Sequence, residues 1–390
     1  MTAATSDFPR DWPLQRLGDI FAFANGVNAD KAAYGKGCRF INVLETITYS
    51  HIHGPEVPGR VTLPNAVVEA YAVEKGDILF NRTSETDADV GLAAAYLGEE
   101  RVVFGGFVIR GRPVKEAFDS TYAGYALRAP FIRSQVISMG QGAVRSNIGQ
   151  ESLKRVVAPV PPATEQREIA KALSDTDALL AGLDRLIAKK RDLKQAAMQQ
   201  LLTGKVRLPG FRDQWRTVRL GDIAKIKTGS RNNEDRVEGG MYPFFVRSDV
   251  VERINTYSYD CEAILVPGEG RIGDIFHYVN GRFDVHQRVY AITQFKPWVS
   301  ARFVHLSMAM NFGEWAMQNT VKATVDSLRL PTFLTFELPV PSMRAEQDAV
   351  AVAISDMDAE IAQLEARHDK TRALKQAMMQ ELLTGRIRLV

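Results

Sequence analysis

The chain has 390 residues, of which 45% are hydrophobic and 24% are charged. This balance is typical of globular domains and excludes a disordered or fibrous chain. Its 49 basic and 46 acidic residues give a formal net charge of +3, which is too small to indicate a nucleic-acid partner and does not exclude one. Cys38 and Cys261 are the two cysteines and lie far apart, so neither a disulfide framework nor a zinc ribbon is expected.

The first residues lack the basic and apolar regions of a signal peptide, and no apolar run reaches the roughly 18 residues that a membrane span needs. We therefore expect a cytoplasmic protein.

The first part of the chain is predicted to be mixed α and β. Runs of β-branched and aromatic residues predict strands at 41–44, 77–80 and 101–110, and a short helix is expected near 121–126. His51 and His53 form an HxH pair without a third ligand nearby, which favours a surface loop over a metal site. Asp87 and Asp89 are likewise interpreted as part of a solvated loop rather than as an acid–base pair.

A long helix is predicted next, from about 164 to 203, with Thr164 as N-cap and Gly204 as C-cap. Its residues follow a heptad pattern. Position a holds Ile169, Thr176, Leu183, Lys190 and Ala197, and position d holds Ala172, Leu179, Leu186 and Leu193. We predict that these two rows form a buried seam against a second helix. The polar a position at Lys190 and, in the other copy, Thr371 is interpreted as a solvated stretch of the helices, with control of register as the alternative.

The second part of the chain has similar signals. Strands are predicted at 263–266, 275–279 and 288–293, a helix near 299–309, and a turn at Asn280-Gly281. A second long helix completes the chain, and Gly385 is its expected C-cap.

The chain contains an internal repeat. Residues 165–208 align with 346–389 without a gap, and 24 of the 44 paired positions are identical. Residues 8–20 also match 211–223, and Pro-Val-Pro precedes both long helices. The blocks between these shared segments are dissimilar. This arrangement favours one frame that carries two different binding surfaces.

The repeat defines the expected organisation. It comprises a first variable domain at 1–158, a first long helix at 159–204, a second variable domain at 205–338 and a second long helix at 339–390. We predict an α+β protein in which two mixed α/β domains are joined by two long helices. The helices are expected to pack as an antiparallel coiled coil with a pseudo-two-fold relation.

Signals of catalysis are absent from the sequence. It contains no Asn-Pro-Pro-aromatic or Asp-Pro-Pro-aromatic tetrapeptide, as an adenine methyltransferase needs, and no GxxxxGK[ST] motif of an ATPase. We therefore expect a non-catalytic protein and disfavour a self-sufficient nuclease.

The layout resembles the specificity subunit of type I restriction–modification enzymes over nearly the whole chain. The resemblance rests on the two Pro-Val-Pro segments that lead into Glu165-Gln166 and Glu346-Gln347, the two Leu-Leu-Thr-Gly endings, the two Arg-Leu-Gly-Asp-Ile segments, and residues 73–82. It implies that each variable domain is a target-recognition domain and reads one half of an asymmetric, bipartite site on double-stranded DNA. It also implies that the helices set the spacer between the halves.

The resemblance further implies partners and the location of the cofactor. Two methyltransferase subunits would dock on the helices and bring S-adenosylmethionine, and restriction or translocase subunits would join them. No cofactor is expected in this chain. A coiled-coil adaptor whose globular domains bind proteins is the alternative function.

The residues that read DNA are sought in polar loops on the β frame, because Arg suits guanine and Asn or Gln suits adenine. In the first domain the candidates are Asn81, Arg82, Thr83, Ser84, Arg145, Ser146 and Asn147. In the second domain they are Arg231, Asn232, Asn233, Arg271, His286, Gln287, Arg288, Lys322, Thr324 and Ser327. Many of these are expected to contact phosphate rather than bases.

Overall fold

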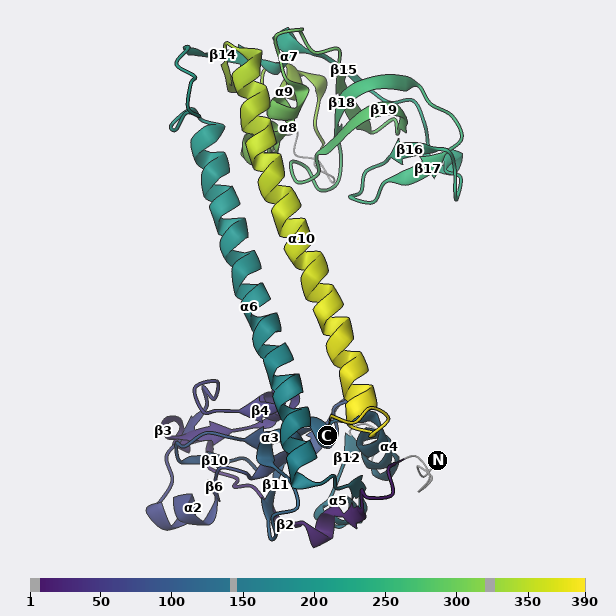
Figure 1. The fold of residues 1–390 in the computed structure, drawn as a ribbon. Coiled ribbons are helices and arrows are strands. Elements are labelled where there is room, and N and C mark those ends of the chain that lie inside the picture. The colour runs from purple at the N-terminus through teal and green to yellow at the C-terminus, as the bar shows by residue number, and fades with distance from the viewer. Residues whose placement is uncertain (1–7, 141–145, 320–326, 390) are drawn as a thin grey trace. The chain divides into compact units, whose positions relative to one another are not determined.

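The computed structural model describes residues 8–140, 146–319 and 327–389. The chain divides into two compact units: Met1–Gly182 with Arg367–Val390, and Leu183–Ala366. Two long helices, α6 (Ala163–Leu201) and α10 (Arg344–Leu382), are continuous through this division (Figure 1). Each unit therefore contains one part of both helices and one mixed α/β domain.

The first unit is built on two sheets. The five-stranded sheet has the order β2-β11-β7-β9-β4 and the four-stranded sheet the order β5-β3-β10-β6; the pairs β1-β13 and β8-β12 complete the unit. The strands are β1 (Leu14–Arg16), β2 (Phe21–Asn25), β3 (Tyr34–Ile41), β4 (His51–Ile52), β5 (Arg60–Val61), β6 (Ala72–Val73), β7 (Ile78–Asn81), β8 (Thr83–Ser84), β9 (Ala93–Tyr96), β10 (Val102–Phe104), β11 (Val108–Pro113), β12 (Ser146–Asn147) and β13 (Val157–Pro159). The central strands β7 and β9 are buried along their whole length and carry the core.

The helices of the first unit cover these sheets and connect them. They are α1 (Val43–Thr48), α2 (Asn65–Ala70), α3 (Ser120–Ala126), α4 (Pro130–Met139) and α5 (Gln150–Arg155), with 3-10 turns at Leu17–Asp19 and Lys31–Ala33. The helix expected near 121–126 is confirmed as α3, which Asp119 caps through the backbone amides of Thr121 and Tyr122.

Three sequence-based predictions for the first unit need correction. The strand at 41–44 ends at Ile41, because Asn42 and Glu45 form a capping box that starts α1. The strand at 101–110 is two strands, β10 and β11, separated by a turn at 105–107. His51, expected in a loop, lies in the short strand β4.

The second unit has one large sheet with the order β15-β20-β18-β19-β16-β17 and the small pair β14-β21. Its strands are β14 (Trp215–Arg219), β15 (Lys225–Thr228), β16 (Tyr242–Phe245), β17 (Glu252–Ile254), β18 (Tyr259–Pro267), β19 (His277–Val285), β20 (Val289–Thr293) and β21 (Glu337–Pro341). Its helices are α7 (Leu220–Ile223), α8 (Ala301–Gln318) and α9 (Leu330–Leu334), with a 3-10 turn at Asn233–Asp235.

The predicted turn at Asn280-Gly281 is wrong. Both residues lie inside β19, where Gly281 pairs with Cys261 of β18 and Asn280 pairs with Glu262. Gly281 has a φ of 128°, a value that glycine adopts without the strain of a Cβ atom. The asparagine–glycine pair therefore marks a local distortion of a long strand and not its end.

The long helices run antiparallel in both units. In the first unit, Lys375 of α10 pairs with Asp177 of α6 at 2.5 Å, and Arg388, which follows α10, reaches Glu165. In the second unit, Lys190 pairs with Glu360 at 2.6 Å and Lys194 pairs with Asp358. As residue numbers rise along α6, those of the partners fall along α10.

The buried seam of the helices differs from the predicted one. In α6 the a row is retained, since Ile169 and Leu183 are 0% and 4% exposed. The predicted d row is wrong, because Leu179, Leu186 and Leu193 are 42%, 39% and 47% exposed. The e row of the heptad is less exposed than the d row; it comprises residues 173, 180, 187, 194 and 201.

The start of each long helix is held by the glutamine of its Glu-Gln pair. The side chain of Gln166 accepts from the amide of Asp119 at 2.7 Å, and that of Gln347 accepts from the amide of Ser300 at 2.7 Å. Thr164, the predicted N-cap, lies inside the first turn, because α6 begins at Ala163. The predicted C-caps are confirmed, with Gly204 and Gly385 at φ values of 72° and 69°.

Candidate nucleic-acid interface

A tight turn joins β10 to β11 in the first unit. The amide of Gly106 donates to the carbonyl of Val27 at 3.0 Å, and the amide of Val108 donates to that of Gly105 at 2.9 Å. Gly106 has no room for a side chain, since a Cβ atom there would lie 2.1 Å from Oδ1 of Asn28. The conformation of this turn is therefore fixed by its neighbours.

The same turn supports the segment after β7. The amide of Arg82 donates to the carbonyl of Phe107 at 2.8 Å, and the amide of Ile148 donates to that of Arg82 at 2.9 Å. Thr83 then pairs with Asn147 across the short sheet β8-β12, and the Thr83 hydroxyl donates to Oδ1 of Asn147 at 2.6 Å.

The second unit repeats the turn with other residues. The amide of Gln287 donates to the carbonyl of Arg231 at 2.8 Å, and the amide of Val289 donates to that of His286 at 2.9 Å. Arg231 and His286 also form a parallel β-bridge, as Val27 and Gly105 do in the first unit.

The supporting segment is repeated as well. The amide of Gly268 donates to the carbonyl of Arg288 at 2.8 Å, and the amide of Leu328 donates to that of Gly268 at 2.8 Å. Glu269 then forms an antiparallel β-bridge with Ser327, as Thr83 pairs with Asn147 in the first unit. These bonds match those of the first unit one by one.

We call this hydrogen-bonded set the loop frame. In the first unit it comprises residues 27, 82–84, 105–108 and 146–148, and in the second unit residues 231, 268–269, 286–289 and 327–328. Its backbone is shared while its side chains differ, so each unit presents its own set of donors and acceptors on the same scaffold.

Most of the first-domain candidates gather in the loop frame. Arg82 is exposed and donates to the carbonyl of Gly106 at 3.3 Å, and Ser146 donates to Asp87. Asn81 is 0% exposed, and its amide nitrogen donates to the carbonyl of Asp89 at 3.0 Å. Through this nitrogen the side chain supports the loop, and it also lines a hollow together with Thr83 and Ser84. Arg145 lies outside the described residues.

The candidates at 231–233 are held by acidic neighbours. Arg231 pairs with the buried carboxylate of Asp284 at 3.0 Å. Asn232 caps the short 3-10 turn together with Asp235, and Asn233 is exposed within it. Arg231 is thus anchored, while Asn233 is available at the surface.

The remaining second-domain candidates differ in exposure. Gln287 and Arg288 are exposed at the turn, whereas His286 is 5% exposed and its Nδ1 accepts from the amide of Arg288 at 3.0 Å. Burial, with nearby arginines, lowers the pKa of His286, so its imidazole is a neutral part of the scaffold. Arg271 pairs with Asp249, and this hydrogen bond raises the pKa of the guanidinium. Lys322 and Thr324 lie outside the described residues.

The structure adds charged residues that the sequence patterns did not identify. Glu269 holds two guanidinium groups, Arg288 at 3.2 Å and Arg247 at 3.4 Å. Arg247 also lines a polar hollow of about 500 Å³, which includes Arg236 and Ser248. Arg247 lies two residues after the end of β16, much as Arg82 follows β7 in the first unit, and this position near a strand end is the signal that could have identified it.

The metal and acid–base alternatives find no support in the geometry. Nε2 of His51 contacts the carbonyl of Thr121 at 2.8 Å, and Asp89 accepts from the hydroxyl of Thr86 at 2.8 Å. Within residues 8–140, 146–319 and 327–389, no group of three or more His, Cys, Asp or Glu side chains is arranged to hold a metal ion.

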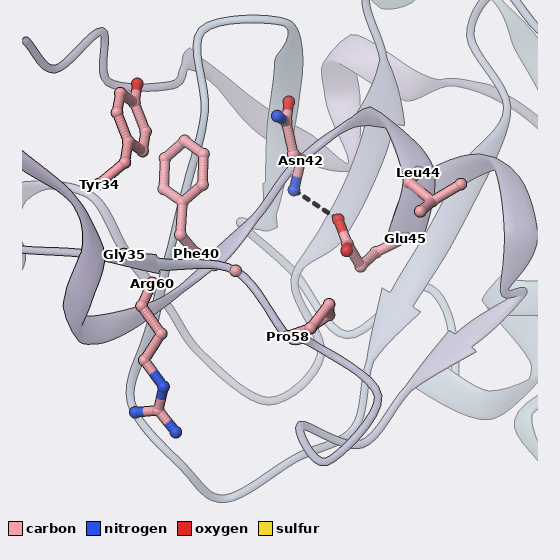
Figure 2. A pocket seen from close by; sticks show the side chains of 9 residues that line it. Tyr34, Gly35, Phe40, Asn42, Leu44, Glu45, Pro58 and Arg60 are labelled. Atoms are coloured by element: carbon pink, nitrogen blue, oxygen red, sulfur yellow. Dashed lines mark hydrogen bonds between the residues drawn. The ribbon is translucent and has the colours of Figure 1, made fainter. Parts of the chain in front are cut away.

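Another hollow of the first unit, of about 450 Å³, lies beside β3 and α1 (Figure 2). Its polar groups serve the local backbone, since Glu45 accepts from the amide of Asn42 at 2.8 Å and Arg60 donates to the carbonyl of Gly37 at 3.2 Å. We assign no binding role to it.

In the part of the chain that the structure describes, none of the helices combines the length and apolar character of a membrane span.

Comparison with known proteins gives a consistent result. The profile of the type I restriction modification DNA specificity domain matches residues 9–189 and again 212–372. The chain is 26% identical, over 98% of its length and 95% of the relative's, to a Methanocaldococcus jannaschii protein whose name makes it a type I restriction enzyme MjaX specificity subunit. It is 28% identical to the EcoDI specificity subunit of Escherichia coli over 44% of this chain and 37% of the relative.

Solved structures share the fold. The S subunit of a type I restriction-modification system from M. genitalium has a TM-score of 0.63 at 16% identity, with 97% of both chains covered. The HsdS subunit of Thermoanaerobacter tengcongensis has a TM-score of 0.56 at 17% identity and covers 99% of this chain and 100% of that one.

Proposed function

The chain belongs to the family of type I restriction modification DNA specificity domains, which it carries twice, and from this premise we propose that its two units read the two halves of one interrupted DNA site. As a family member it serves recognition and is not itself the enzyme. The observation that supports two different half-sites is the loop frame, whose backbone bonds are repeated while its side chains change.

The side chains of the loop frame suit base and phosphate contacts. The first unit offers a guanidinium at Arg82 beside the hydroxyls of Thr83 and Ser146. The second unit offers Arg288 within the frame and, outside it, Arg247, which pairs with the frame residue Glu269. Arginine donates in a fork that fits guanine O6 and N7 or a phosphate. The ion pairs with Glu269 restrict both guanidinium groups of the second unit before DNA arrives, which lowers the ordering cost of binding.

The experiment is a binding or methylation assay on DNA in which one half-site at a time is altered. We expect Arg82→Ala to weaken recognition of one half and Arg288→Ala that of the other, each by roughly 5-fold to 160-fold, since a good base contact is worth about 1–3 kcal/mol. Arg101→Ala and Arg219→Ala are matched controls, because both arginines are 61% exposed and lie outside the loop frame. Equal losses on both halves from either variant would contradict the proposal.

The competing function is a coiled-coil adaptor that binds proteins through its globular domains. Family membership does not favour it. DNA recognition predicts that affinity falls steeply with salt, because each phosphate contact releases counterions. A protein-binding adaptor would show no specific, salt-dependent affinity for DNA.

The family name also implies that the chain assembles with the other subunits of a type I system. We propose that two methyltransferase subunits dock on faces that the two long helices share, and that restriction or translocase subunits join them. The support is the repeat, since a partner bound twice needs the same exposed residues twice. Such residues are Lys189, Leu193 and Ala196 on α6 and their identical counterparts Lys370, Leu374 and Ala377 on α10.

Substitution of the shared leucines tests this docking. Leu193 and Leu374 are 47% and 57% exposed, so Leu193→Asp or Leu374→Asp should remove one methyltransferase subunit each, and the double variant both. Leu186→Asp is the control, because Leu186 is 39% exposed but aligns with Arg367 in the other repeat. Native mass spectrometry counts the bound subunits; two subunits retained by the double variant would exclude these faces.

The cofactor follows from the same division of labour. We propose that S-adenosylmethionine is bound by the methyltransferase subunits and that this chain binds none. We place the complex in the cytoplasm because its substrate is the DNA of the cell.

A further inference from the structure

Phe107 occupies an unusual position for a phenylalanine. It is 54% exposed at the turn between β10 and β11, and among the described residues it belongs to no hydrophobic core cluster and no ring–ring contact. Single exposed apolar residues are common on protein surfaces, so the meaning of this one comes from its place in the loop frame.

The turn fixes the backbone of Phe107. The carbonyl of Phe107 accepts from the amide of Arg82 at 2.8 Å. The two preceding glycines are packed closely, since a Cβ atom at Gly105 would lie 2.7 Å from the ring of Phe40. Because the backbone is already ordered, only the side-chain torsions of Phe107 remain to be fixed when a ligand covers the ring.

The second unit shows what this position can do. In the loop frame of the second unit, the carbonyl of Arg288 takes the place of the carbonyl of Phe107. It accepts at 2.8 Å from the amide of Gly268, the residue that follows the central strand β18. The Arg288 side chain is 57% exposed. One position of the shared backbone thus carries a guanidinium in one unit and an aromatic ring in the other.

The neighbours of Phe107 are hydrogen-bonding side chains of the kinds that suit base edges. Phe107 lines a hollow of about 280 Å³ together with Thr83 and Ser84, and Arg82 donates to the adjacent carbonyl of Gly106. In the major groove, such donors and acceptors meet bases that also present one apolar group, the C5-methyl of thymine. An aromatic ring among hydrogen-bonding side chains is suited to that methyl group.

We propose that Phe107 is a specificity-determining residue of the first unit and packs against the C5-methyl group of a thymine in its half-site. The proposal rests on the proposed function, since it presupposes that the first unit reads DNA. Phe107 and Arg288 occupy the same position of the loop frame. In the proposal this position contacts the thymine methyl group in the first half-site and a hydrogen-bonding group in the second.

Deoxyuridine provides an atom-level test, because it differs from thymidine by this methyl group alone. The complex with its methyltransferase subunits is assayed for binding on duplexes in which each thymine of the site is replaced by uracil in turn. The half-site of the first unit is the one whose recognition Arg82→Ala weakens. We expect one replacement there to weaken binding about fourfold, the factor that corresponds to burial of one methyl group.

The variant Phe107→Ala completes a double-mutant cycle between protein and DNA. It should bind the thymine duplex more weakly and bind thymine and uracil equally at that position, while Phe107→Leu should keep part of the discrimination. Discrimination at the second half-site should be unchanged, which shows that the variant is folded. Arg288→Ala should weaken discrimination at the second half-site and leave the uracil effect at the first half-site unchanged.

Three results would overturn the inference: a first half-site without thymine, no uracil effect there in the wild type, or an unchanged uracil effect in Phe107→Ala. Each of these leaves specific DNA binding by the complex in place. Failure of the proposed function is different, because the complex would then lack half-site discrimination altogether.

Discussion

At the scale of single residues, each unit contains a cluster of tryptophan, glutamate and arginine where one long helix begins and the other ends. In the first unit, Nε1 of Trp12 donates to Glu165 at 3.0 Å, and Arg388 donates to Glu165 at 2.6 Å and to Asp11 at 2.8 Å. The guanidinium also lies 5.5 Å from the centre of the indole ring. The Glu165 side chain is 0% exposed, so these donors replace the water that it loses on folding.

The second unit repeats the cluster. Nε1 of Trp215 donates to Glu346 at 3.4 Å, and Arg207 donates to Glu346 at 2.6 Å and lies 5.7 Å from the indole ring. Residue 207 aligns with 388 and 165 with 346 in the internal repeat. Each cluster therefore takes its glutamate from one repeat and its arginine from the other, which ties the end of one long helix to the start of its neighbour.

Arg388→Ala tests the first cluster. Removal of the guanidinium leaves the buried carboxylate of Glu165 with fewer donors, and we expect the free energy of unfolding to fall by about 2 kcal/mol. Arg386→Ala is the control, since its side chain is 67% exposed and should cost less than about 0.5 kcal/mol. Urea unfolding measures both; equal small losses would show that the cluster contributes little.

At the scale of elements, the long helices show how a heptad pattern can be misassigned. Leucine or isoleucine occupies positions 173, 180 and 187 as well as 179, 186 and 193, so two rows of α6 are equally apolar in sequence. The a row lies between them and can pair with either. Ion pairs such as Lys194 with Asp358 place the row at 194 toward α10, and the other row is left exposed.

Two leucines three positions apart distinguish the two seams. Leu183 is 4% exposed and Leu186 is 39% exposed. We expect Leu183→Ala to cost about 2–3 kcal/mol of stability through the lost contacts and the cavity, and Leu186→Ala less than about 1 kcal/mol. Thermal or denaturant unfolding of the two variants gives the comparison. Similar losses would instead favour the a and d seam that the heptads predict.

At the scale of the whole molecule, we propose that the paired helices set the spacing of the two half-sites. Seven residues inserted in each helix, after Gly182 and after Ala366, fall at the division between the units and keep the heptad phase. They lengthen the helices by roughly 10 Å, so the preferred spacer should grow by about three base pairs.

The control for this change is the same insertion in α6 alone, which puts the two helices out of step and should abolish coordinated recognition of both halves. Methylation of a set of DNA duplexes with graded spacers measures the preference. An unaltered spacer preference in the doubly extended chain would show that the helices do not act as the ruler.

The sequence by itself determined the elements that depend on local or repeated patterns. The length of the helices, their C-cap glycines at 204 and 385, the duplication and the family all follow from residue spacing, because capping and periodicity act within a few residues. Candidates such as Arg82 and Arg288 were identified because polar residues after apolar strands lie in loops at the edge of a sheet.

The tertiary structure alone decided which side chains those loops expose. Asn81 and Arg82 are neighbours of similar polarity, yet Asn81 is 0% exposed and Arg82 is exposed, because alternate residues leaving β7 point to opposite faces. Phe107 reads in sequence as one more apolar residue of a strand, and only the glycine turn places it at the surface. The choice of the seam, the clusters of tryptophan, glutamate and arginine, and the loop frame all depend on contacts between residues far apart in the chain, which no local pattern records.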